Sequence, residues 1–183
     1  MKRRQLIAAS MAASVCSAIP VGWAAMGKRP ELIGTLPEHR LQGTARLTVY
    51  GFKVYDSRLW VAPGFSSENF ANQAFGLELD YLRDFKSDAI VDRSLTEMRR
   101  FGMFTAEQAS TWRLAMLRAI PNVNKGDRIM GINSPGDGAT FWLNGQRSGD
   151  IQDAEFARLF FSIWLSPKTS HPKMRASLLA IAA

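Results

Sequence analysis

Cysteine and histidine are scarce in this chain. Its 183 residues include one cysteine, Cys16, and two histidines, His39 and His171. A lone cysteine cannot form an intramolecular disulfide, and neither histidine has a carboxylate at helical spacing. We therefore expect no metal site.

Phosphate-binding loops and basic blocks are also missing. The segment GINSPGDG, residues 131–138, lacks the Lys-Ser/Thr that follows such a loop, so it is typical of a turn, and no cofactor is expected. The net charge is +7, but Lys and Arg are scattered along the chain. This pattern disfavours nucleic-acid binding and allows at most a peripheral contact with anionic membranes.

The longest uncharged apolar run is short and lies near the N-terminus. The basic MKRR is followed by QLIAASMAASVCSAI and by small residues at Gly22 and Ala24, the layout of a secretory signal peptide over residues 1–24. We expect cleavage after Ala24 and a periplasmic protein without Cys16. An uncleaved membrane anchor is the alternative, although the run falls short of the roughly 20 residues that span a bilayer.

The first half of the remaining chain predicts strands. Residues 25–42 have the composition of a loop that can hold one short strand. Residues 43–62 are rich in β-branched and aromatic residues, and Gly51 suits a turn or bulge between two strands. Residues 75–84 alternate, with apolar side chains on one face and Glu78 on the other, which predicts a half-buried strand.

Two helices and a second set of strands follow. Ser87 suits the N-cap of the first helix, and Thr105-x-x-Gln108 matches a capping box for the second. Asn144-Gly145 is a strong hairpin signal, because both turn positions tolerate a positive φ. The next helix, which Asp150 or Asp153 would cap, is so apolar that it must be buried on most sides. A catalytic pair of these two carboxylates is the less favoured interpretation.

The segment Thr169-Ser170-His171 places a hydroxyl beside a histidine. A serine directly next to a histidine rarely reaches it productively, and catalytic triads are assembled from distant segments. We favour a corner between two helices, with Ser170 as the N-cap of the last helix and His171 and Pro172 in its first turn.

One basic residue stands out in an apolar strand region. Arg46 begins the first strand and Tyr55 lies in the second, so a turn near Gly51 could make them cross-strand neighbours. Together they could bind a carboxylate or a polarised carbonyl group. The alternative is an exposed arginine and a packed tyrosine.

Several stretches resemble the chalcone isomerase-like family, in its bacterial exported branch. They cover Gly43 to Leu179 and read GTARLTVYGFKVYDSRLWVA, FGLELDYLRDF, GDRIM, FWLNGQRSGDIQDAEFARLFFSIWLSP and MRASLL. The resemblance implies an α+β fold, the open-faced β-sandwich, in which a large antiparallel sheet carries helices layered on one face. It implies a chalcone isomerase-like domain over residues 43–183.

The resemblance also implies site residues. The family's early arginine corresponds to Arg46, and the threonine of the chalcone-cyclising enzymes corresponds to Tyr55, where fatty-acid-binding relatives carry a tyrosine. The other enzyme positions fall on Lys86 or Ser87, on Arg93 and on Ala157. Most of the catalytic set is therefore missing.

Three functions follow, in order of preference. The first is a non-catalytic protein that binds a small apolar carboxylate, such as a fatty acid, through Arg46 and Tyr55. The second is an envelope protein that binds a partner and no ligand. The third is an isomerase or intramolecular lyase on an enone-like substrate, with Arg46 stabilising the developing oxyanion.

Overall fold

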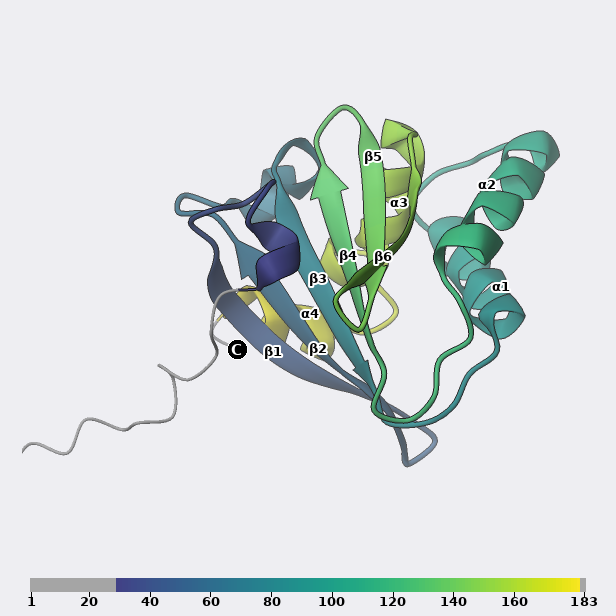
Figure 1. Ribbon diagram of the computed structural model, residues 1–183, viewed down its shortest axis with the longest axis horizontal. Coiled ribbons are helices and arrows are strands. Elements are labelled where there is room, and N and C mark those ends of the chain that lie inside the picture. Colours follow the sequence, from purple (N-terminus) through teal and green to yellow (C-terminus); the bar gives the residue numbers. More distant parts are fainter. Residues whose placement is uncertain (1–28, 182–183) are drawn as a thin grey trace, which may run out of the picture.

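The computed structural model describes residues 29–181 (Figure 1). The predicted signal peptide, its cleavage site and Cys16 lie outside these residues. The elements, in chain order, are η1 (Pro30–Leu32), β1 (Arg40–Val49), β2 (Phe52–Val61), η2 (Ser67–Asn72), β3 (Phe75–Tyr81), α1 (Ser87–Met98), α2 (Ala106–Ala119), β4 (Arg128–Ser134), β5 (Gly138–Leu143), β6 (Gln146–Ile151), α3 (Ala154–Leu165) and α4 (Pro172–Leu179).

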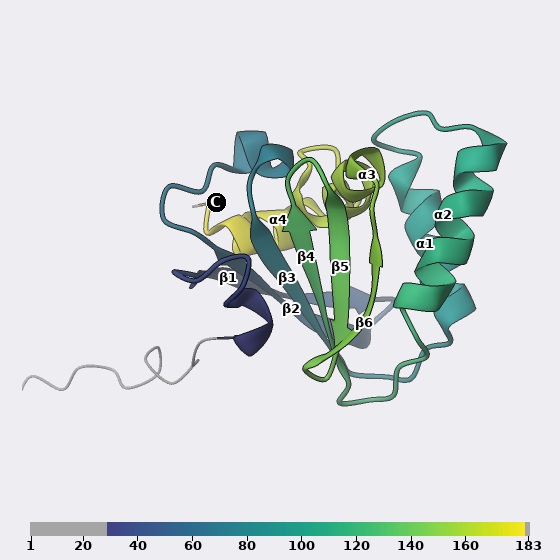
Figure 2. The ribbon, with the colours of Figure 1, turned by 45° about the horizontal axis from the view of Figure 1, so that its top comes forward.

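The six strands form one antiparallel sheet in the order of the sequence, β1 to β6. The β1–β2 hairpin turns through Tyr50 and Gly51, and the β5–β6 hairpin turns through Asn144 and Gly145. All four residues have positive φ, the geometry that two-residue hairpin loops favour. Helices α3 and α4 pack across one face of the sheet, and α1 and α2 lie beside α3, beyond β6 (Figure 2). The predicted α+β, open-faced architecture is confirmed.

The starts of α2 and α3 follow local chemistry as expected, whereas the start of α1 does not. Thr105 and Gln108 form the predicted capping box at the start of α2. Asp153 caps α3 by accepting a hydrogen bond from the backbone N–H of Phe156. Helix α1, however, is N-capped by Lys86, and Ser87 is its first residue, because the Ser87 hydroxyl donates instead to the Ile120 carbonyl that follows α2.

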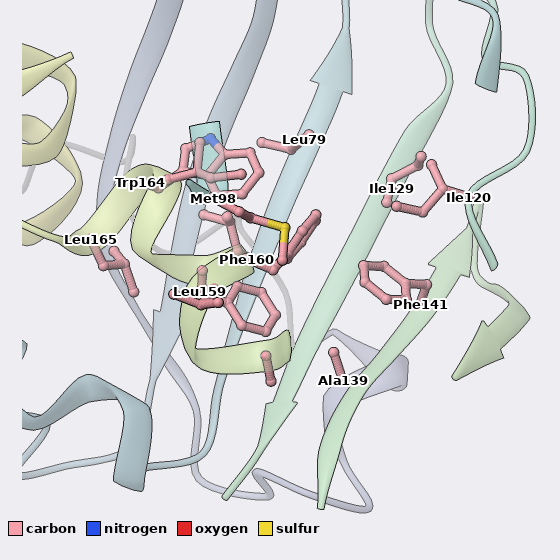
Figure 3. Close-up of a cluster of buried hydrophobic side chains, with 14 of the residues drawn as sticks. Leu79, Met98, Ile120, Ile129, Ala139, Phe141, Leu159, Phe160, Trp164 and Leu165 are labelled. Carbon is pink, nitrogen blue, oxygen red and sulfur yellow. The ribbon is translucent and has the colours of Figure 1, made fainter. Parts of the chain in front are cut away.

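Helix α3 is the centre of the core, as its composition predicted. Its side chains pack against the sheet and against α1, and the close-up in Figure 3 shows Phe160 and Trp164 among residues from strands β3 to β5. Phe160 and Phe141 meet edge to face, with ring centroids 5.4 Å apart. Burial of such apolar surface is the main favourable contribution to folding. The contacts of α3 with the sheet are therefore central to the stability of this domain.

The opposite face of the sheet is covered by the segment that precedes β1. Leu32 and Leu36 pack there against Trp60 and Met130. The prediction that the polar face of β3 is exposed is therefore wrong: Glu78 is fully buried. The residues before β1 are a packed cover rather than a plain loop, and β1 itself begins at Arg40.

The corner before α4 exists, but Ser170 does not cap the helix. His171 occupies the N-cap position and makes no side-chain capping bond. The Ser170 hydroxyl donates instead to Glu97 Oε2 of α1 at 2.9 Å. A hydrogen bond to a charged carboxylate is stronger than one to a neutral backbone group, so the tertiary partner outcompetes the local one.

Candidate functional site: an apolar pocket between sheet and helices

A pocket of about 600 Å³ lies between the helices and the face of the sheet on which α3 packs. Strands β1 to β5 line one side, and α1, α3 and the corner before α4 line the other. Most of the lining is aliphatic or aromatic, including Leu77, Leu79 and Ile129 from the strands and Phe160 from α3. This size and this chemistry are those of a site for a small apolar molecule.

Two buried phenols line this pocket. Tyr55 of β2 and Tyr81 of β3 are paired across the strands and meet edge to face, with ring centroids 5.9 Å apart. The Tyr55 hydroxyl accepts a hydrogen bond from Trp164 Nε1 at 3.0 Å. Burial raises the pKa of both phenols well above the ordinary value, so both stay protonated. Within residues 29–181 neither hydroxyl donates a hydrogen bond, so both are available to a ligand oxygen.

Charged groups gather where α1 meets the corner before α4. Arg93 Nη2 lies 2.5 Å from Glu97 Oε1, and Arg100 Nε lies 3.6 Å from Glu97 Oε2. The Glu97 side chain is 8% exposed, whereas that of Arg93 is 65% exposed. The Arg93 guanidinium therefore reaches the solvent side of the pocket, while Glu97 anchors it from within.

His171 also lines the pocket, and its environment keeps it neutral. Burial lowers its pKa, Glu97 acts in the opposite direction, and Arg93 and Arg100 lower it further. Its neighbour Ser170 is bonded to Glu97 rather than to the imidazole. The adjacent hydroxyl and histidine therefore do not form a nucleophile–base pair, in agreement with the structural interpretation of this corner.

The structure separates the two residues predicted to form one site. Arg46 is opposite Asp56 in the β1–β2 ladder, and Tyr55 is opposite Leu47. Because successive residues of a strand point to opposite faces, Tyr55 points into the pocket and Arg46 to the other side of the sheet. There Arg46 forms an ion pair with Asp56 at 2.5 Å, which raises the pKa of Arg46 and lowers that of Asp56. The expectation that Arg46 and Tyr55 form a common handle was therefore wrong.

The other candidates named from the sequence are structural. Asp153 caps α3 and accepts a second hydrogen bond from Trp112 Nε1 at 2.7 Å. Asp150 pairs with Arg147 on β6, and Ala157 is buried in α3. These contacts account for each residue without a ligand.

Tyr81 and Glu97 of the pocket were not singled out as site residues from the sequence, and His171 was considered there only as a base beside Ser170. Tyr81 had a usable signal, because strict alternation puts it on the apolar face of its strand. No local pattern connects Glu97 with His171, since they come from different helices. Arg93 was singled out only because the family resemblance places an enzyme residue there.

Within residues 29–181 no group of three or more His, Cys, Asp or Glu side chains could hold a metal ion. None of the helices in that part of the chain combines the length and apolar character that crossing a bilayer requires.

The fold and the pocket together define a class: an open-faced β-sandwich with an internal apolar site between sheet and helices. A family model described as chalcone isomerase-like matches residues 37–180, and the chain belongs to this family. Among curated proteins no sequence matches significantly. The crystal structure of a fatty-acid binding protein from Arabidopsis thaliana is similar in fold, with a TM-score of 0.60 and 11% identity, over 78% of this chain and 87% of that one.

Proposed function

We propose that this protein binds a small apolar carboxylate, such as a fatty acid, in the pocket and does not transform it. The observation that carries the proposal is the pocket itself: about 600 Å³ of largely apolar space with two protonated phenols inside and a guanidinium at its edge. The Arabidopsis thaliana protein of similar fold, a fatty-acid binding protein, supports the proposal.

The charges of the pocket indicate where the carboxylate would lie. An ionised carboxylate buried among apolar side chains is costly unless a cation and hydrogen-bond donors compensate it. Tyr55, Arg93 and Glu97 all line the pocket, and Arg93 and Glu97 form an ion pair there. A carboxylate beside Tyr55 and Arg93 would accept a hydrogen bond from the phenol and face the guanidinium. The hydrocarbon chain would then extend along the apolar lining.

An isomerase or lyase, third in order of preference from the sequence, becomes the second candidate because of His171. A neutral imidazole on the pocket wall could accept a proton from an enone-like substrate, and the two phenols could donate to the developing oxyanion. We rank it lower because the position that the cyclising enzymes fill with threonine holds Tyr55, which occupies part of the space that a chalcone would need.

We also propose that the protein is exported and acts in the periplasm. The proposal is based on the charged start, the apolar run and the small residues of segment 1–24. N-terminal sequencing of protein from a periplasmic extract should begin near Ala25. A start at Met1 in a membrane fraction would reject export with cleavage.

Titration with a fluorescent fatty acid tests the binding proposal. Arg93→Gln should weaken binding about tenfold, because a charge-assisted hydrogen bond contributes roughly 1.5–3 kcal/mol. Tyr55→Phe should weaken it about fivefold, the effect of losing one neutral bond of about 1 kcal/mol. Arg46→Gln is the matched control: it removes another solvent-exposed, ion-paired arginine, on the opposite face of the sheet, and should leave the affinity unchanged.

Three results would contradict the proposed binding site or the proposed function. Loss of affinity in Arg46→Gln with none in Arg93→Gln would place the carboxylate on the other face of the sheet. Absence of saturable binding in the wild type would reject a fatty-acid ligand and favour the partner-binding alternative. Cyclisation of chalcone, followed by absorbance and abolished by His171→Asn, would instead establish an enzyme.

A further inference from the structure

The tip of the β1–β2 hairpin exposes large apolar side chains. Tyr50 is 96% exposed and Phe52 is 60% exposed, and Val49 next to them is also exposed. In the view of Figure 1 this tip extends beyond the ends of the other strands. Clustered exposed aromatics on a projecting tip differ from the single exposed apolar residues that any protein surface carries.

The backbone geometry of the turn does not favour a tyrosine at position 50. Its φ is 48°, in the left-handed region that favours glycine and asparagine. The other two-residue hairpin of this sheet follows that preference, with Asn144 at the equivalent position and a φ of 51°. A bulky aromatic residue in the same place is locally unfavourable, which points to a role for the exposed ring.

Two positively charged side chains flank the tip. Between Leu47 and Tyr55 the only charged residue is Lys53. The Arg83 guanidinium lies over the Phe52 ring, 4.8 Å from its centroid. The neighbouring acid, Asp84, is engaged in accepting a hydrogen bond from the backbone N–H of Lys125. The tip thus combines aromatic rings with flanking cations.

The same tip forms part of the pocket wall. Val49, Tyr50, Phe52 and Arg83 all line it, together with the buried residues further along β1, β2 and β3. Leu47 and Val54, which also line the pocket, continue the apolar surface from the solvent-exposed tip toward the interior. A molecule that leaves the pocket here would meet whatever covers the tip.

We propose that this tip, defined as Val49 to Lys53 together with Arg83, docks into the interface of a lipid bilayer with anionic headgroups. Aromatic rings with amphipathic character prefer the headgroup level of a bilayer, and each nearby Lys or Arg is attracted to anionic lipid. A protein partner fits less well, because a stable protein interface needs about 20–30 residues on each side and this projection offers only a few. Passage of the ligand between bilayer and pocket along this surface rests on the binding function proposed above.

Co-sedimentation with vesicles tests the proposal. Protein free of fatty acid is mixed with vesicles of phosphatidylglycerol and phosphatidylcholine, or of phosphatidylcholine alone. The double variant Tyr50→Asn/Phe52→Thr should partition at least tenfold less than the wild type, and its Asn-Gly turn should preserve the hairpin. Lys53→Gln should lose about fivefold on the anionic vesicles only. Met103→Gln and Leu114→Gln are controls, because both remove exposed apolar side chains far from the pocket wall.

The possible outcomes test the docking surface independently of the proposed fatty-acid binding. Equal partitioning of the double variant and the wild type, or no vesicle binding by the wild type, overturns the proposal whatever the fatty-acid affinity. A dimer that the double variant abolishes, without vesicle binding, overturns it in favour of a second copy of the chain. Tip-dependent vesicle binding by a protein that takes up no fatty acid supports the docking surface and rejects the ligand.

Discussion

Replacing Glu78 by glutamine should be among the most destabilising single changes in this protein that keep the shape of a side chain. Glu78 is fully buried on the face of the sheet opposite the pocket. Its carboxylate accepts hydrogen bonds from Arg29 Nε at 2.6 Å, Arg58 Nη1 at 2.8 Å and Trp60 Nε1 at 3.2 Å. Arg128 Nη1 lies 3.6 Å away. Glutamine removes the negative charge while all three arginines stay in place.

The expected loss of stability depends on how deeply Glu78 and its arginine partners are buried. Removing one partner of a buried ion pair costs about 3–5 kcal/mol. The arginine side chains retain 22–24% of their exposure, so water can compensate part of the loss. We expect Glu78→Gln to lower the free energy of unfolding by about 2–4 kcal/mol. Because Arg29 precedes η1, amide exchange in residues 30–36 should speed up as well.

Asp56→Asn is the matched control for this change. Asp56 lies on the same face of the sheet and also pairs with an arginine, but the Arg46–Asp56 pair is partly exposed to solvent. Water screens such a pair, so it contributes little to stability. Urea denaturation of both variants at pH 7 measures the loss of stability in each. Added salt should reduce the loss in Asp56→Asn and leave that in Glu78→Gln unchanged. A cost below about 1 kcal/mol for Glu78→Gln would refute the view that this carboxylate holds the N-terminal cover in place.

Two further predictions concern α2 and the histidine of the pocket. Thr105→Ala removes the capping box of α2 and should cost about 1 kcal/mol in urea denaturation, whereas Thr111→Ala, on the exposed side of the same helix, should cost less. The lowered pKa of His171 means that the unfolded chain binds its proton more readily, so stability should fall as the pH drops through about 6.5. His171→Asn should flatten that slope in melts between pH 5 and 8; an unchanged slope would rule out His171 as its source.

Local sequence patterns predicted the elements of the fold well because their physics is local. The Asn144-Gly145 turn, the Thr105 capping box and the all-round apolar helix α3 each depend on residues a few positions apart. The order of strands and helices, together with the family resemblance, then led to the open-faced sandwich. Tyr55, named from the expected hairpin and from the family resemblance, lines the pocket.

Errors arose where a distant segment competes with a local preference. Ser170 could cap α4, but Glu97 of α1 takes its hydrogen bond. Glu78 lies on the polar side of its strand, yet residues far earlier in the chain bury it with three arginines. No local sequence pattern around Glu97 or Glu78 predicts the residues that these carboxylates contact. Such contacts depend on how the elements pack rather than on their periodicity.

The sequence alone determined which segments become strands and helices, where they turn, and that one face of the sheet meets a buried helix. Only the tertiary structure decided which side chains share the pocket. The β1–β2 register places Arg46 opposite Asp56 and not opposite Tyr55. Because side chains alternate between the faces of a strand, that single step sends the arginine to the other side of the sheet. The cations that line the pocket are instead Arg83 and Arg93, which come from other segments of the chain.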